Sequence, residues 1–123
     1  MPDIEATHGM QVADVAGLTP RNGVMVLDVR EPWEWAQGHI PGAVLIPMME
    51  VPGRLKEIPE SGTVIVACHS GNRSERVTWY LRAHGYRDVF NMLGGMVAWA
   101  RAGYPIEKPD NTGTRESRGQ GGP

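Results

Sequence analysis

The sequence predicts an α/β domain with a mainly parallel β-sheet covered by helices on both faces. Four short apolar runs have the length and β-branched content of buried strands, at residues 24–29, 42–47, 63–67 and 88–92. Helical patterns and turn signals separate these runs along the chain. Strands that alternate with helices favour parallel pairing, because each connection crosses one face of the sheet.

The segments between the strands predict helices of different strength. Pro32 follows the first strand and begins one or two helical turns that end near Gly38. Residues 48–58 predict a weak helix that Pro52 interrupts. Residues 95–102 predict a last short helix.

The clearest helix is predicted over residues 74–84. Its apolar face follows the i, i+3, i+4, i+7 spacing, through Val77, Tyr80, Leu81 and His84. Ser74 is placed to cap its N-terminus, and Gly85 ends it.

Composition places the chain among small globular proteins. Its 123 residues suffice for one domain, and 41% are apolar and 21% charged. The net charge of -2, the lack of a long apolar run and the lack of a secretory signal predict no nucleic-acid partner, no membrane partner and a cytoplasmic location. Residues 105–123 are rich in proline and glycine, so we expect a domain over 1–107 and a disordered tail over 108–123.

The only cysteine, Cys68, lies between the predicted strand 63–67 and the predicted helix 74–84. Ligands bind beyond the carboxyl ends of the strands in such sheets, and a helix N-terminus stabilises a thiolate. The backbone N–H groups that follow Cys68 can form a concave anion site, with Gly71 supplying the curvature. We therefore predict that Cys68 is catalytic and that its substrate contacts the loop residues His69, Ser70, Gly71, Asn72 and Arg73.

Three further residues are expected to support this loop. Asp28 ends another strand and is predicted to form a structural ion pair with Arg30 or Arg73. Two interpretations of Arg30 remain open, because it could face the site and attract anions or pair with Glu31 or Glu34. Ser74, at the predicted helix start, is the third supporting residue.

The residue inventory also restricts the chemistry. There is no second thiol to resolve a cysteine intermediate, so an external acceptor must discharge it. The four histidines lack the spacing of zinc ligands, and we expect neither a metal nor a cofactor.

Three sequence blocks resemble the single-domain rhodaneses, which are thiosulfate sulfurtransferases. They are LDVREPWEW with GHIPGA over residues 27–43, CHSGNRS over 68–74 and LGGMVAW over 93–99. The resemblance spans residues 10–104 and implies a three-layer rhodanese-like domain with a five-stranded sheet. It also implies that Cys68 takes a sulfane sulfur from thiosulfate or a similar small anionic donor and passes it to cyanide or a thiol, including the thiol of a partner protein.

Two alternatives belong to other functional classes. A rhodanese-like module could bind partners without turnover, although its relatives of that kind usually lack the cysteine. A cysteine phosphatase or arsenate reductase is disfavoured by loop length, because the related phosphatases have Cys-x5-Arg where Cys68 and Arg73 form Cys-x4-Arg.

Overall fold

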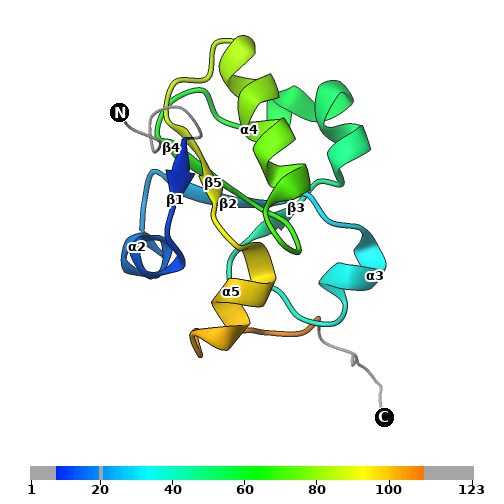
Figure 1. The fold of residues 1–123 in the computed structure, drawn as a ribbon. Coiled ribbons are helices and arrows are strands. Elements are labelled where there is room, and N and C mark those ends of the chain that lie inside the picture. Colours follow the sequence, from blue (N-terminus) through cyan, green and yellow to red (C-terminus); the bar gives the residue numbers. More distant parts are fainter. Residues whose placement is uncertain (1–7, 20, 110–123) are drawn as a thin grey trace.

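A computed structural model describes residues 8–19 and 21–109 of the chain (Figure 1). It contains one five-stranded sheet of order β1-β5-β4-β2-β3 in which every pair of neighbours is parallel. The strands are β1 (Gly9–Met10), β2 (Val24–Asp28), β3 (Val44–Leu45), β4 (Thr63–Ala67) and β5 (Val89–Met92). The predicted mainly parallel sheet is therefore confirmed.

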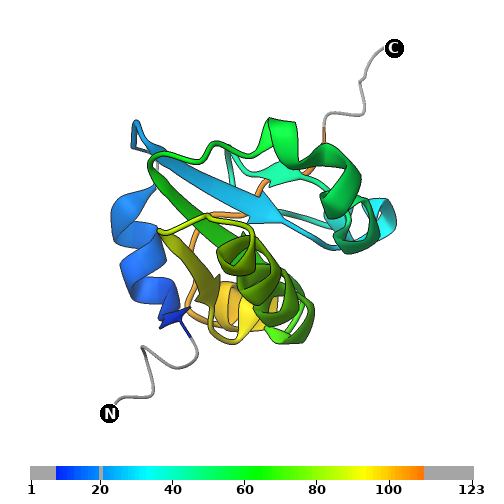
Figure 2. The same cartoon turned by 90° about the horizontal axis from the view of Figure 1, so that it is seen from above.

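Of five helical segments, four pack against the sheet, two on each face, and the remaining short one contributes no residue to the apolar core (Figure 2). The five segments are α2 (Val12–Leu18), α3 (Pro32–Trp35), the 3-10 segment η1 (Met48–Glu57), α4 (Asn72–Ala83) and α5 (Gly95–Arg101). None of the helices among the described residues is long and apolar enough to cross a membrane.

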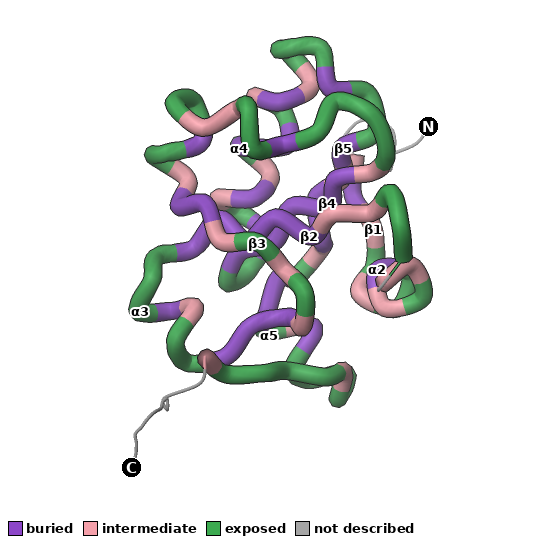
Figure 3. Tube along the Cα trace, turned by 180° about the vertical axis from the view of Figure 1, so that it is seen from behind, coloured by how far each residue is buried: buried purple, intermediate pink, exposed green. Residues whose placement is uncertain are grey.

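The alternation of side chains along β4 divides the core into two clusters. Val64 and Val66 pack with side chains of α4 and η1 on one face. Ile65 and Ala67 pack with side chains of α2 and α5 on the other. The strands form the buried centre seen in Figure 3, which makes the ends of β2 and β4 a rigid base for the loops that follow them.

Some elements differ from the prediction. The sequence pattern missed β1 and α2, and the strand expected over 42–47 pairs only through Val44–Leu45. A strand of two residues is too short to show an alternating pattern, and its position depends on pairing with β5. Most of the predicted tail, residues 110–123, lies outside the described residues, so the domain boundary stays a prediction.

The start of α4 also corrects a prediction. The helix begins at Asn72, and Gly71 with φ of 105° is its N-cap residue. Ser74 is therefore not the cap but lies in the first turn, with its side chain buried. The left-handed backbone at position 71 explains why glycine occupies it.

Candidate active site

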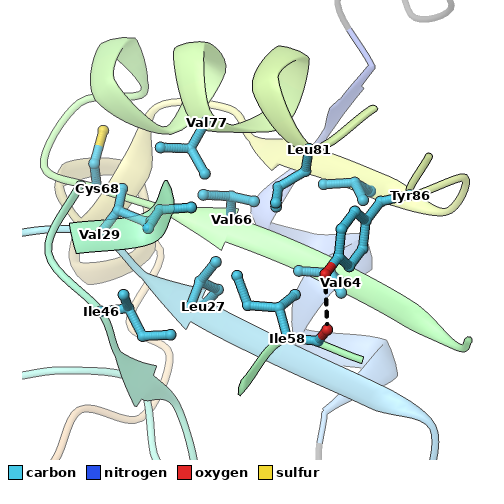
Figure 4. Packing of buried hydrophobic residues seen from close by; sticks show 12 residues of the cluster. Leu27, Val29, Ile46, Ile58, Val64, Val66, Cys68, Val77, Leu81 and Tyr86 are labelled. Atoms are coloured by element: carbon cyan, nitrogen blue, oxygen red, sulfur yellow. Dashed lines mark hydrogen bonds between the residues drawn. The ribbon is translucent and has the colours of Figure 1, made fainter. Parts of the chain in front are cut away.

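Cys68 follows β4 directly and is 1% exposed. Figure 4 shows its sulfur at the border of the apolar cluster, directed toward the start of α4. The backbone N–H groups of Gly71 and Ser74 lie 3.1 and 3.3 Å from Sγ and donate to it. The sulfur therefore accepts two backbone hydrogen bonds from the first turn of α4 and the loop before it. The predicted combination of strand end, loop and helix start is present.

A buried polar network holds the other side of the sulfur. The Ser74 hydroxyl lies 3.2 Å from Sγ and donates its hydrogen to Oδ1 of Asn91 on β5. Since a hydroxyl has one hydrogen, Oγ of Ser74 accepts from the S–H group when Cys68 is neutral. Asn91 in turn donates to the Gly71 carbonyl at 3.2 Å and ties the loop to β5.

The carbonyl groups of the loop are held by α5. Met96 and Val97 donate their N–H groups to the carbonyl oxygens of Cys68 and His69, at 2.8 and 3.0 Å. Gly95 makes this contact possible, because a Cβ at that position would lie 2.5 Å from each of these oxygens. The GlyGly pair of the third sequence block thus supports the loop through the backbone.

Asp28 and Arg30 form a buried ion pair beside the site. Nε of Arg30 lies 2.9 Å from Oδ1 of Asp28, and Nη2 lies 2.8 Å from Oδ2. The same guanidinium donates to the carbonyl groups of Glu34 and Gly38. The predicted ion pair of Asp28 is with Arg30 and not with Arg73, and Arg30 also lines two pockets that His69 borders. The charge of Arg30 also acts on the Glu34 carboxylate and helps to lower its pKa.

Arg73 forms a bidentate ion pair with Glu34 on α3. Its two terminal nitrogens lie 2.8 Å from the two carboxylate oxygens. Glu34 is positioned by a capping box in which its Oε1 also accepts the N–H of Glu31. The hydrogen bonds from Arg73 are the largest cause that lowers the pKa of Glu34 from 4.5 to about 2, and the same pairing raises the pKa of Arg73.

Two residues of this site were not predicted to belong to it. Glu34 lies 39 positions from Arg73 in the sequence, so only the fold reveals their pairing. Asn91 could have been noticed in the sequence, because it is a polar residue within the apolar run of β5. In the structure it is 3% exposed. Buried polar side chains of this kind usually have a specific hydrogen-bond partner.

Two pockets of about 240 and 180 Å³ lie next to the loop at His69, and together they are called the mouth of the site. Both are lined by Arg30, Gln37 and His69, the smaller also by Trp33 and Glu34, and the larger also by Gly38, Met96, Val97, Ala100 and Ile106. His69, Ser70 and Asn72 are exposed along the loop. Among residues 8–19 and 21–109, no three metal-ligating side chains gather.

Fold and site together define the class of protein as an α/β domain with a buried free thiol at the carboxyl edge of a parallel sheet. The model of the rhodanese-like domain family matches residues 11–102. The chain therefore belongs to the rhodanese-like family and is a sulfurtransferase of that family.

Two sequence relatives indicate its closeness to named members. The sulfurtransferase of Allochromatium vinosum is 44% identical over 93 residues, which cover 76% of this chain and 87% of that protein. The thiosulfate sulfurtransferase GlpE of Pseudomonas putida is 34% identical over 90 residues, which cover 73% of this chain and 81% of that protein.

Two solved structures confirm the fold class. The rhodanese-like domain protein of Staphylococcus aureus matches with a TM-score of 0.73 and 34% identity, over 82% of this chain and 97% of that one. The rhodanese-related protein of Thermoplasma volcanium matches with a TM-score of 0.76 and 30% identity, over 82% and 98%.

Proposed function

We propose that this protein transfers sulfane sulfur from thiosulfate or a similar small donor through a persulfide on Cys68. The thiolate attacks the outer sulfur of the donor, the sulfur–sulfur bond to the sulfonate breaks, and sulfite leaves with the bonding electron pair. The product is Cys68–S–S⁻. Cyanide or a thiol, including a partner protein's thiol, then takes the outer sulfur and restores the thiolate.

The observation that carries this proposal is the position of Sγ. It accepts hydrogen bonds from the N–H groups of Gly71 and Ser74 at the start of α4. These fixed donors stabilise the attacking thiolate without reorganisation during the reaction. We propose that the N–H groups of His69, Ser70, Asn72 and Arg73 line the space in which the added sulfur and the donor bind.

Loop length and charge disfavour the phosphatase alternative. The loop from Cys68 to Arg73 is one residue shorter than the phosphatase loop, and the Arg73 guanidinium is occupied by Glu34. An arginine held by a carboxylate offers little to a phosphate dianion. Hydrolysis of an aryl phosphate that disappears in Cys68→Ser would favour the phosphatase instead.

Mass spectrometry of the intact protein tests the sulfurtransferase directly. After incubation with thiosulfate and removal of the donor, we expect a mass gain of one sulfur atom that maps to Cys68. Cyanide should remove the added sulfur and release thiocyanate. The matched variant Cys68→Ser should fold normally and gain nothing. A wild-type protein that gains no sulfur from any sulfane donor would instead support the non-catalytic module.

A further inference from the structure

The positive charges beside Cys68 are neutralised in pairs. Arg30 is held by Asp28, and its side chain is 6% exposed. Arg73 interacts electrostatically with Cys68, but both of its terminal nitrogens are bound by Glu34. Among the described residues that line the two pockets, the only other titratable side chain is His69.

This arrangement leaves the Cys68 thiolate without a full positive charge of its own. Glu31 adds a further negative charge that acts on Arg73. Thiosulfate carries two negative charges, so Coulomb repulsion opposes its approach to the thiolate, and an arginine that is already paired with a carboxylate reduces this repulsion less than a free cation would. A sulfur donor with one negative charge or none is repelled much less by the Cys68 thiolate.

The pocket walls suit an organic substituent. Trp33 is 65% exposed, Ile106 43% and Val97 36%, and all three border the same mouth as His69. The Met96 side chain lies among them. These apolar surfaces offer contacts to a carbon chain, which thiosulfate lacks.

We propose that Glu34, by neutralising Arg73, makes the site selective for sulfane donors that carry at most one negative charge, such as the hydropersulfide of a thiol, over dianionic thiosulfate. This inference rests on the sulfurtransferase function proposed above. In the step, Cys68–S⁻ attacks the outer sulfur of R–S–SH and forms a new S–S bond, while the S–S bond of the hydropersulfide breaks. The products are Cys68–S–S⁻ and R–SH, because the proton of the hydropersulfide moves to the leaving sulfur.

Two donors that differ by one charge test the inference. Methanethiosulfonate, CH₃SO₂S⁻, replaces one charged oxygen of thiosulfate with a methyl group and leaves as sulfinate. The rate constant for sulfur transfer to Cys68 is measured for both donors by mass spectrometry. Each value is divided by that for transfer to 2-mercaptoethanol, which corrects for intrinsic reactivity. The corrected rate constant for methanethiosulfonate should exceed that for thiosulfate by roughly tenfold. The rate constant for thiosulfate should also rise with ionic strength, because salt screens the repulsion.

Substitutions at the ion pair assign the effect to Glu34. Glu34→Gln frees the charge of Arg73 and should raise the thiosulfate rate by roughly tenfold, with a smaller change for methanethiosulfonate. The double variant Glu34→Gln with Arg73→Gln restores neutrality, and the donor ratio should return to the wild-type value. Gln37→Lys adds a cation at an exposed position of the same mouth. It should shift the ratio toward thiosulfate even where the Glu34 variant fails to fold.

The outcomes separate this inference from the function on which it rests. Equal or faster corrected transfer from thiosulfate in the wild type would overturn the donor preference and leave the sulfurtransferase function intact. A donor ratio unchanged by both Glu34→Gln and Gln37→Lys would overturn the role of Glu34. Transfer from neither donor would overturn the sulfurtransferase function, and the donor preference with it.

Discussion

Gly95 provides the sharpest test of how the loop around Cys68 is supported. Replacing it with alanine would place a methyl group 2.5 Å from the carbonyl oxygens of Cys68 and His69. These are backbone atoms that accept hydrogen bonds from α5, so relief of the clash must separate α5 from the loop. We expect about 1 kcal/mol for the left-handed backbone and about 2 kcal/mol more for the overpacking.

Gly103 is the matched control for this substitution. Its backbone is also left-handed, with φ of 82° against 59° at Gly95, but a Cβ there meets nothing within 4 Å. Gly103→Ala should therefore cost only the backbone strain, about 1 kcal/mol. Thermal unfolding should place Gly95→Ala roughly 10 °C below Gly103→Ala, and sulfur transfer to Cys68 should slow only in Gly95→Ala. Equal melting temperatures, or equal transfer rates, would refute the reasoning.

Three further predictions concern the network, the ion pair and the tail. Ser74→Ala leaves Oδ1 of buried Asn91 without its donor and should lower the free energy of unfolding by about 1–3 kcal/mol in urea titrations; an unchanged midpoint would contradict this. The pKa of Glu34 is about 2 in the folded protein against 4.5 ordinarily. Its pairing with Arg73 therefore stabilises the fold above pH 4.5 and is lost as the pH falls toward 2. Discounted for the partial exposure of Arg73, the loss should be about 1–2 kcal/mol, and Arg73→Gln should flatten the pH dependence of unfolding over that range. Deletion of residues 108–123 should leave sulfur transfer unchanged, and a large loss would refute the tail assignment.

Four of the five strands and the position of Cys68 could be predicted from the sequence, because their signals are local. Buried strands of a parallel sheet are continuous apolar runs, and β4 was predicted with its observed bounds. The apolar spacing predicted the approximate range of α4, but it did not predict that the helix begins at Asn72. Gly71, with its left-handed backbone, is the N-cap residue. Ser74, which was predicted to be the cap, therefore lies inside the first turn.

The partners of the site residues could not be predicted in the same way. Whether Asp28 pairs with Arg30 or Arg73 depends on where α3 places Glu34, which takes Arg73. The contact between Ser74 and Asn91 likewise joins α4 to β5. Such pairs depend on the packing of separate elements, and no local pattern encodes the distances between them.

The sequence by itself determined that this chain is an α/β protein with one thiol between a buried strand and a helix. That much follows from apolar periodicity, turn residues and the single cysteine, all of which act over a few neighbouring residues. Only the tertiary structure decided that Arg73 is bound by Glu34 and that α5 supports the loop of Cys68. The parallel sheet brings these distant segments to one edge. The ion pairs and hydrogen bonds of the site form there between residues of different elements, so they depend on how the elements pack.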